Sequence, residues 1–350
     1  MLSFSKIKPQ LNLMKNSKNW IIALLVVIIA GGAFYIFACD GKEAGPNDEP
    51  KGPPPAEITL ENDFTPPTGS AGTAKETPGA RRIMSAYSDD GLTWTKTNKV
   101  ITDQADVGEI VIDEKGIIYL YYYGWTVGDK ENIPAMAISQ DNGETWTFKN
   151  MSWEGFPNRG DLADPDLLYE NGIFRLYGST RTPDGFINVA YGESTDGINF
   201  EYKGLAFEMS EGMGGGVAST HYINDQYHLL SLGALGQPGE EHGLHWYATS
   251  KDGNVFEYIE KVFFTANNHN YHVGNAIPMD EGMRLYLFTP AGGSPILSWF
   301  STNGKDWELE EGNRLELDED SGLEKGYLGE PDVLQLPDGR YFMTYSTFIP

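Results

Sequence analysis

The sequence predicts an all-β fold, a five-bladed β-propeller that spans residues 81–350. Three observations support this prediction: a polar turn motif recurs five times, short alternating runs flank each copy, and the copies start 51 to 56 residues apart. A polar turn between two alternating runs is typical of a β-hairpin. The clearest copy is SQDNGETW from Ser139, and the others are SDDGLTW from Ser88, STDGINF from Ser194, SKDGNVF from Ser250 and STNGKDW from Ser301.

A second kind of hairpin alternates with the first. Each copy is a strand, a turn signal and a second strand rich in β-branched and aromatic residues. Each repeat unit therefore supplies four strands, which matches the blade of a propeller, where radial repetition buries each sheet against its neighbours. The copies are GEIVIDEKGIIYLYYYG, DPDLLYENGIFRLYGS, GVASTHYINDQYHLLSLG, NAIPMDEGMRLYLFTP and EPDVLQLPDGRYFMTYS.

The order of the two hairpins predicts how the ring closes. The motif at Ser88 has no hairpin of the second kind before it, and the last such hairpin, which ends near Phe348, has no motif after it. We therefore expect residues 81–97 to supply the outer two strands of the blade whose inner two strands lie in 327–348.

Residues before the propeller are predicted to form a basic cytoplasmic tail (1–18), a transmembrane or signal anchor (19–39) and a disordered Pro/Gly/Glu-rich linker (40–80). Nineteen residues without a charge, 20–38, are long enough to span a bilayer. Lysines precede this segment and acids follow it, so the positive-inside rule leaves the N-terminus in the cytoplasm. The rest of the protein is then extracytoplasmic, at the cell surface or in the periplasm.

The only cysteine, Cys39, ends the sequence IFAC, which resembles a bacterial lipobox. The resemblance implies a lipoprotein, with cleavage after Ala38 and a lipid on Cys39. The alternative is an ordinary cysteine at the end of a retained membrane helix. In both cases the propeller has no disulfide, so its stability must come from the core.

The acidic composition excludes some partners. The formal net charge is −25. Such a surface repels nucleic acid and anionic lipid headgroups, so no nucleic-acid partner is expected, and an anionic sugar is disfavoured.

The motif turns are predicted to lie on one face of the disc and the long loops on the other. Loops positioned by a rigid scaffold are the usual place for binding and catalysis. The motif itself is therefore interpreted as structural, with Asp141 accepting backbone N–H bonds within its turn and Trp146 packing between strands.

Three motifs resemble known families. SQDNGETW, with its degenerate copies, resembles the Asp-box (BNR) repeat of sialidases and related propellers. ADPDLLYENGIFRLYGS from Ala163 resembles the Asp-Pro strand of glycoside hydrolase families 43 and 32, and GEPDVLQLPDGRYFMTY resembles the Glu-bearing strand of sialidases. The resemblance covers residues 81–350 and implies a five-bladed propeller that acts on glycans.

A glycosidase needs one carboxyl group to protonate the leaving oxygen and a second to act as base or nucleophile. On this interpretation Asp164 is the base or nucleophile, Glu330 is the acid, and Asp166 and Glu109 tune pKa values. The alternative is that the DPD and EPD sequences are structural devices that bond neighbouring loop amides. Other acids at the same strand entrances are Asp106, Asp161 and Asp332.

The sequence departs from both family patterns. Family 43 places Asp, Asp and Glu on successive blades, but the blade after Asp164 begins GVASTHY and has no Glu at the matching place. A sialidase needs a cluster of arginines, and the loop face offers chiefly Arg159 and Arg181. The usual RIP start and the sixth blade of sialidases are also missing.

Several further residues on the loop face are candidates for substrate binding, because aromatic faces stack on sugar rings and polar groups orient them. His221 and His272 could instead hold a metal, or the acids could hold calcium, and ordinary hydrogen-bonded histidines are the other alternative. No metal or cofactor is assigned. The substrate-binding candidates are Trp125, Trp153, Arg159, Asp161, Arg181, His221, His272, Asn275 and Asp332.

The sequence thus predicts a membrane-anchored, extracytoplasmic propeller that binds a neutral glycan and, as a glycoside hydrolase, cleaves it. One alternative is a non-catalytic carbohydrate-binding or adhesion module, and another is a sialidase-like exo-glycosidase.

Overall fold

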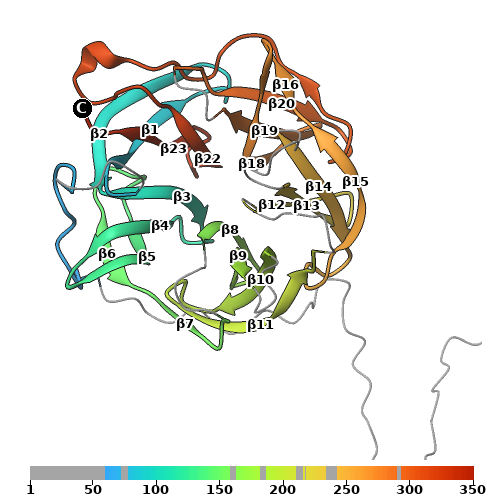
Figure 1. Cartoon of the computed structure of the whole chain (residues 1–350), viewed down its shortest axis with the longest axis horizontal. Helices are drawn as coiled ribbons and strands as arrows, with labels where there is room; N and C mark the ends of the chain where they lie inside the picture. The colour runs from blue at the N-terminus through green and yellow to red at the C-terminus, as the bar shows by residue number, and fades with distance from the viewer. Residues whose placement is uncertain are drawn as a thin grey trace, which may run out of the picture. The chain divides into compact units, whose positions relative to one another are not determined.

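The computed structural model is a ring of five β-sheets, so the predicted five-bladed, all-β propeller is confirmed (Figure 1). The structure describes residues 60–71, 78–157, 163–181, 187–209, 216, 218–233, 243–289 and 293–350. The predicted tail (1–18) and anchor (19–39) lie outside these residues. No helix in the described ranges is long and apolar enough to cross a membrane.

Each blade runs outward from an inner strand that faces the axis. Blade 1 consists of β3 (Ala105–Ile112), β4 (Ile118–Val127), β5 (Lys130–Ser139) and β6 (Thr147–Asn150). Blade 2 consists of β8 (Ala163–Glu170), β9 (Ile173–Arg181), β10 (Ile187–Ser194) and β11 (Asn199–Phe207), with β7 (Ser152–Glu154) added at its outer edge. Blade 3 consists of β12 (Ala218–Ile223), β13 (Gln226–Leu232), β14 (Leu244–Ser250) and β15 (Glu257–Phe263).

Blade 4 consists of β18 (His272–Met279), β19 (Gly282–Phe288), β20 (Leu297–Ser301) and β21 (Glu308–Leu309). Blade 5 consists of β22 (Gly329–Gln335), β23 (Tyr341–Phe348), β1 (Arg81–Ser88) and β2 (Trp94–Asp103). The connections also contain the two-stranded ribbon of β16 (Thr265–Ala266) and β17 (His269–Asn270), and the 3-10 helix η1 (Glu319–Ser321).

The core is divided among the seams between blades. The inner strands β3, β8, β12, β18 and β22 each contact the inner strands of both neighbours. Buried hydrophobic side chains form five clusters, and each cluster joins residues of two adjacent blades. Each blade therefore needs its neighbours to bury its hydrophobic faces, and the blades are stable only together, as a ring.

The ring is closed by two strands from opposite ends of the domain. β1 pairs with β23 from Arg81 opposite Phe348 to Ser88 opposite Tyr341. Blade 5 therefore has the strand order β2-β1-β23-β22, with its outer hairpin supplied by the start of the domain.

The motif turns bind their own backbone and dock on a neighbouring blade. Asp141 Oδ1 accepts a bond of 2.8 Å from Thr145 N, and Trp146 Nε1 donates to Gly143 O at 3.1 Å. Gly143 has a φ of +89°, and a Cβ there would lie 2.6 Å from the ring of Phe342 in blade 5. Trp146 is half-buried and packs on the same seam, which agrees with a structural turn.

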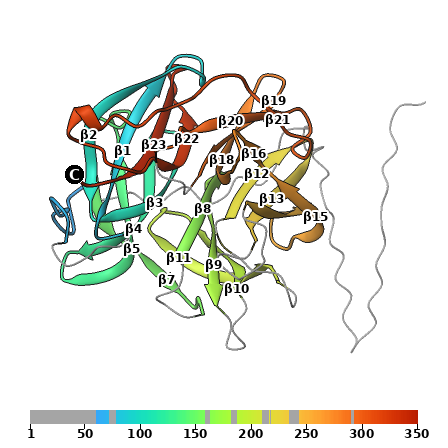
Figure 2. The same cartoon turned by 45° about the horizontal axis from the view of Figure 1, so that its top comes forward.

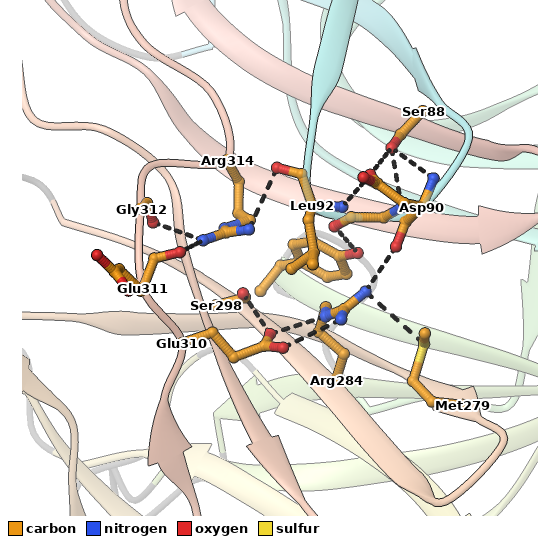
Figure 3. A network of polar contacts seen from close by, with 12 residues as sticks. Ser88, Asp90, Leu92, Met279, Arg284, Ser298, Glu310, Glu311, Gly312 and Arg314 are labelled. Carbon is orange, nitrogen blue, oxygen red and sulfur yellow. Dashed lines mark hydrogen bonds and ion pairs between the residues drawn. The ribbon is translucent and has the colours of Figure 1, made fainter.

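The first motif turn is fixed to blade 4 by two arginines (Figure 3). Arg284 donates to Asp90 O at 3.0 Å and pairs with Glu310 at 2.7 Å, while Arg314 donates to Leu92 O at 3.2 Å. Arg175, at the equivalent position of blade 2, donates to Asp252 O in the turn of blade 3 at 2.7 Å. These contacts show that both strand arginines, Arg175 and Arg284, tie one blade to the turn of another.

Part of the predicted linker 40–80 packs on blade 1. Residues 60–71, which we call the strap, are the blue segment at the left edge of Figures 1 and 2. Asp63 N donates to Phe148 O at 2.8 Å, and Asp63 Oδ2 accepts from Asn150 N at 2.9 Å, so the strap extends the edge of β6. Phe64 is buried, with its ring centroid 5.9 Å from that of Phe148. A single aromatic residue thus anchors a segment whose composition alone is typical of a linker.

Candidate active site

Three inner strands begin with the same irregularity. The pairing register shifts between Asp106 and Glu109 in β3, between Ala163 and Asp166 in β8, and between Gly329 and Asp332 in β22. A residue with positive φ lies in each bulge: Val107 at 48°, Asp164 at 48° and Glu330 at 51°. Strained backbone of this kind persists where the surrounding structure enforces it, and it concentrates at functional sites.

The bulges of β8 and β22 follow from their sequences. Pro165 and Pro331 come directly after the positive-φ residues, and proline has no N–H to donate to the ladder. At the bulge, the first acid of each DPD or EPD sequence no longer follows the regular alternation of side chains between the two faces of the strand.

Arg81 links the first acids of blades 1 and 5. Its Nη1 lies 2.7 Å from Asp106 Oδ1 and 2.8 Å from Glu330 Oε1. The guanidinium also lies 4.1 Å from the ring centroid of Tyr327, and Glu330 Oε2 accepts a bond of 3.0 Å from Val107 N. Two carboxyl groups and one cation therefore share a small, largely buried volume.

The surroundings move the pKa values of these acids in opposite directions. Burial alone would raise the pKa of Glu330, but the Arg81 charge, a hydrogen bond from Asp106 and the Val107 N–H together lower it to about 2. Burial and the charge of Glu330 raise the pKa of Asp106 well above its usual range. Burial and the same charge raise the pKa of Asp164 to about 6, although Arg81 opposes this shift. The site therefore holds one firmly ionised carboxylate, Glu330, beside acids that hold their protons more tightly than usual.

A second carboxyl pair lies deeper along the same two strands. Glu109 and Asp332 are hydrogen-bonded to each other, and Glu109 Oε2 and Asp332 Oδ1 are buried without a further partner. Burial and the Asp332 charge raise the pKa of Glu109 well above its usual range, and burial raises the pKa of Asp332 to about 6. The pair thus keeps one proton between its two carboxyl groups near neutral pH.

The second acids of the DPD and EPD sequences, together with Asn275 of blade 4, also tie the blades to one another. Asp332 Oδ2 accepts from Ile110 N of blade 1 at 2.9 Å, and Asp166 Oδ2 accepts from Thr220 N of blade 3 at 2.8 Å. Asn275 of blade 4 accepts from Val333 N at 2.9 Å. Each side chain satisfies a backbone amide of the next inner strand, as the structural alternative for DPD and EPD predicts. Burial, followed by the charge of Asp332, raises the pKa of Asp166 to about 8.

The two predicted tryptophans lie in different blades. Trp125 is half-buried near the end of β4 that pairs with the start of the inner strand β3, and its backbone N donates to Gln104 O at 2.8 Å. Trp153 lies in β7, at the opposite edge of the blade 2 sheet from the inner strand β8. The prediction that Trp153 binds substrate with the entrance acids does not fit this position, because the short parallel pairing of β7 with β11 carries the residue to the rim.

The two predicted histidines are buried. His221 stacks on His228 with ring centroids 5.2 Å apart, and its Nε2 lies 3.3 Å from Gly304 O in a motif turn. Burial, with a smaller effect from His228, lowers the pKa of His221 to about 3. His272 begins β18 and packs edge-on against Phe288. Within the described ranges, no group of three or more His, Cys, Asp or Glu side chains is arranged to hold a metal.

Three predicted positions cannot be placed at the site. Arg159 and Asp161 lie outside the described residues, and Arg181 is described only as the last residue of β9. Conversely, Arg81 and Tyr327 contact the entrance acids, although neither stands in a motif that points to the site. The sequence gives only an indirect indication, and only for Arg81. This residue begins the strand that the order of the two hairpins assigns to the last blade.

Comparison with known proteins identifies the fold. No family model matches the chain, and no curated protein matches it. A thermostable family-43 glycoside hydrolase is similar in structure, with a TM-score of 0.54 and 14% identity over 70% of this chain and 88% of that one. A glycosyl hydrolase from Bacteroides ovatus has a TM-score of 0.52 and 14% identity, over 71% of this chain and 82% of that one. A β-1,2-mannobiose phosphorylase from Listeria innocua has a TM-score of 0.50 and 13% identity, over 80% of this chain and 94% of that one. At these identities the similarity establishes a shared fold.

Proposed function

We propose that the protein is a glycoside hydrolase whose reaction takes place at the first acids of blades 1, 2 and 5. The observation that carries the proposal is the gathering of acids from different blades around one cation, since Arg81 Nη1 lies 2.7 Å from Asp106 Oδ1 and 2.8 Å from Glu330 Oε1. The charge of Glu330 also acts on Asp164 of blade 2 and, after burial, raises its pKa to about 6, while the pKa of Glu330 itself is lowered. Two carboxyl groups whose pKa values are moved apart can take different roles in one reaction.

The directions of the two pKa shifts support one assignment of the roles. The raised pKa of Asp164, about 6, suits it to protonate the leaving oxygen, while Glu330, whose lowered pKa keeps it ionised, is suited to act as a nucleophile or to stabilise positive charge on the sugar. These roles are the reverse of the sequence interpretation, and Arg81 is the reason, because its charge keeps Glu330 ionised.

The charge of the site supports a neutral substrate. Arg81 is already paired with both Asp106 and Glu330. The carboxyl groups around it outnumber it, so an anionic sugar would meet repulsion rather than a cation that is available for binding. This disfavours the sialidase-like alternative.

The test is a screen of aryl glycosides of neutral sugars, followed by variants on the sugar that responds. Asp164→Asn should reduce kcat by roughly 10²–10⁴-fold on a glycoside with a poor leaving group. The loss should be much smaller on a nitrophenyl glycoside, whose leaving group needs no proton. Glu330→Gln should reduce both activities alike.

Asp338→Asn is the matched control, since Asp338 is an exposed acid in the turn between β22 and β23. Full activity of Asp164→Asn and Glu330→Gln would refute the assignment. Parallel assays with inorganic phosphate distinguish hydrolysis from phosphorolysis. Glycan binding by calorimetry without turnover of any substrate would favour the non-catalytic binding module instead.

We propose in addition that residues 19–39 anchor the protein in a membrane and leave the propeller outside the cytoplasm. The support is the uncharged segment 20–38 with lysines before it and acids after it. The full chain should stay in the membrane pellet after an alkaline wash, and protease added to intact cells or spheroplasts should remove the propeller. Replacing Cys39 with Ala separates a lipid anchor, which would be lost, from a retained helix, which would not.

A further inference from the structure

The five motif turns dock on the ring in the same way. In each turn the glycine packs on the second strand of a neighbouring blade, where a Cβ would lie 3.0 Å or less from a side chain. These side chains, which we call the docking residues, all stand directly after the residue that pairs with the motif serine of their own blade. Figure 3 shows the contact made by blade 4. In blades 1 to 5 the docking residues are Tyr119, Arg175, His228, Arg284 and Phe342, and they meet Gly197, Gly253, Gly304, Gly91 and Gly143.

Blade 3 differs from the other blades in the chemistry of this contact. Elsewhere the docking residue is an arginine, a tyrosine or a phenylalanine, and the residue opposite it on the inner strand is aliphatic. In blade 3 both are histidines, since His221 pairs with His228. Tyrosine and phenylalanine stay neutral and arginine stays charged near neutral pH, whereas histidine changes its charge there. The other pairs are Tyr119 with Val111, Arg175 with Leu168, Arg284 with Ile277 and Phe342 with Leu334.

The two histidines, which we call the histidine pair, are stacked beneath the turn of blade 4. Their ring planes are 11° apart, and Trp307 packs edge-on against His221 at 5.6 Å between centroids. His221 Nε2 lies 3.3 Å from Gly304 O, and because a carbonyl only accepts, Nε2 carries the proton of the neutral ring. A second proton would go to His221 Nδ1, which is buried without a partner. His228 Nδ1 lies 2.7 Å from Tyr247 Oη. A charged His221 would therefore lack an acceptor for its new N–H.

The charged groups near the histidine pair are engaged elsewhere. Lys305 of the turn is paired with Glu260 of β15 at 2.8 Å. Asp306 accepts a bond of 2.8 Å from Asn303 Nδ2 within the turn, and Asp225, between β12 and β13, accepts from a tyrosine hydroxyl at 3.5 Å. In the part of the chain that the structure describes, no carboxyl group is bonded to either ring of the pair. A proton added to the pair is therefore not neutralised by a neighbouring acid.

A third histidine lies on the same seam but not beneath the turn. His245 stands near the start of β14, at the other end of that strand from its motif turn. Its Nε2 accepts a bond of 3.2 Å from Val273 N of blade 4. Its contribution to the behaviour of the seam has to be separated from that of the histidine pair.

We propose that the seam between blades 3 and 4 is an acid-sensitive joint, in which protonation of the histidine pair releases the turn 301–307 from blade 3 while the other seams stay closed. The turn must move before water can reach the pair, because a Cβ on Gly304 would lie only 3.0 Å from His228. The joint is independent of the reaction proposed for the entrance acids. It links the integrity of the ring to the acidity of its surroundings.

The direction of the pH dependence follows from the protons that each state holds. In the closed joint burial, followed by the charge of His228, lowers the pKa of His221 to about 3, although the Gly304 carbonyl opposes this shift. Burial also lowers the pKa of His228, against an opposing effect of the Ile223 backbone. Hydrated histidine has a pKa of about 6.5, so below that pH the open joint binds more protons and opening becomes more favourable. From pH 7.5 to pH 5 the opening constant should rise about 30-fold if one ring is protonated, and up to about 1,000-fold if both are.

The test is thiol labelling of the full chain, in which the only native cysteine, Cys39, is replaced by Ala. Leu285→Cys places a single thiol in the seam between blades 3 and 4, and Leu176→Cys places one in the seam between blades 1 and 2. The two leucines are a matched pair, because both are fully buried and each stands directly after the docking arginine of its strand. A pyridyl disulfide reagent is used at pH 7.5 and pH 5, and each rate is divided by that of the unfolded chain at the same pH.

The corrected labelling rate follows the fraction of molecules whose seam is open. The Leu285→Cys chain should be labelled at least about 30-fold faster at pH 5 than at pH 7.5. The Leu176→Cys chain should change by less than about threefold, because its seam contains no histidine pair. Equal acceleration of the two chains would overturn the proposal, since acid would then loosen the whole ring. A Leu285→Cys chain without acceleration would overturn it as well.

Two double variants, each combined with Leu285→Cys, remove the titration and keep the docking contact. His221→Leu with His228→Arg copies the pair of blade 2, and His221→Leu with His228→Phe copies the pair of blade 5. In each variant that melts normally at pH 7.5, the acceleration should be at least about tenfold smaller than in the parent. His269→Gln removes an exposed histidine between the same two blades and should leave the acceleration unchanged.

A folded double variant that keeps the full acceleration would assign it to His245 or to another group and would contradict the proposal. Loss of the acceleration in His269→Gln would contradict it too. The comparison of Leu285→Cys with Leu176→Cys needs no change in the histidine pair, so it decides the matter even where a double variant does not fold.

Discussion

Arg81 and Glu330 lie 249 residues apart in the sequence, yet Arg81 Nη1 lies 2.8 Å from Glu330 Oε1. The arginine belongs to the first strand of the domain and the glutamate to the inner strand of the last blade. Since Arg81 also binds Asp106 of blade 1, one guanidinium joins the closing strand, the last blade and the first blade. The electrostatics of the candidate site are therefore tied to the closure of the ring.

Replacing Arg81 with Ala should lower the free energy of unfolding by about 3 kcal/mol near pH 7, because it leaves two buried carboxyl groups without their cation. The Arg81→Ala, Glu330→Gln double variant should recover part of this loss. The deficit should shrink as the pH falls below about 4, since Arg81 lowers the pKa of Glu330 and its stabilisation disappears once that group is protonated. Urea unfolding between pH 3 and pH 7 measures both effects, and a deficit that does not change with pH would contradict them.

The activity should follow the protonation of Asp164. If Asp164 is the general acid, kcat/KM should fall by about tenfold per pH unit above its raised pKa, near pH 6. Because the charge of Glu330 contributes to this pKa, the carboxyl resonance of Asp164 should titrate at lower pH in Glu330→Gln. Carbon-13 NMR of labelled protein reports this shift even where the variant is inactive. An unchanged titration would mean that the two groups do not interact.

Glu109→Gln should stabilise the protein at pH 8 and leave it nearly unchanged at pH 4. Burial and Asp332 raise the pKa of Glu109, so the folded parent holds a proton that the unfolded chain releases, and stability falls as the pH rises. A glutamine amide donates to Asp332 without that cost, and the gain should be roughly 1 to 3 kcal/mol at pH 8. Glu114→Gln, an exposed acid in the turn after β3, should change the melting temperature little at either pH.

Phe64→Ala should show that the strap belongs to the folded domain. Phe64 is 7% exposed and packs on the seam between blades 5 and 1, so its removal should cost about 3 kcal/mol of unfolding free energy. Leu60, in the same segment but 46% exposed, is the matched control and should change stability by no more than about 0.5 kcal/mol when replaced by Ala. Equal melting of the two variants would show that the strap does not pack in solution.

The blade number followed from the sequence because each motif turn is a local signal. Ser139, Asp141, Gly143 and Trp146 interact within one turn, and five copies are counted without knowing any distant contact. The burial of the strap could not be foreseen in the same way. Phe64 is the one buried side chain of the strap, most of whose other residues are polar or proline, and one aromatic residue defines no period.

The candidate site was accessible to sequence reasoning only in part. The entrance acids stand out because DPD and EPD recur at equivalent places, whereas their partners come from other blades. The contact of Arg81 with Glu330 depends on ring closure, and that of Asp166 with Thr220 N depends on the register between inner strands. The proposed roles of Asp164 and Glu330 are the reverse of those the sequence suggested, because the proposal uses pKa shifts that depend on neighbours from other strands.

Because β1 pairs with β23, blade 5 cannot be completed until the end of the domain has been synthesised. The hairpin of β1 and β2 is complete at Asp103, but the strand that covers its inner edge ends at Phe348. At roughly 5–20 residues per second, the growing chain carries that edge uncovered for tens of seconds. During this interval the inner edge of the first hairpin stays unpaired, and it is exposed to aggregation until the last strand has been made.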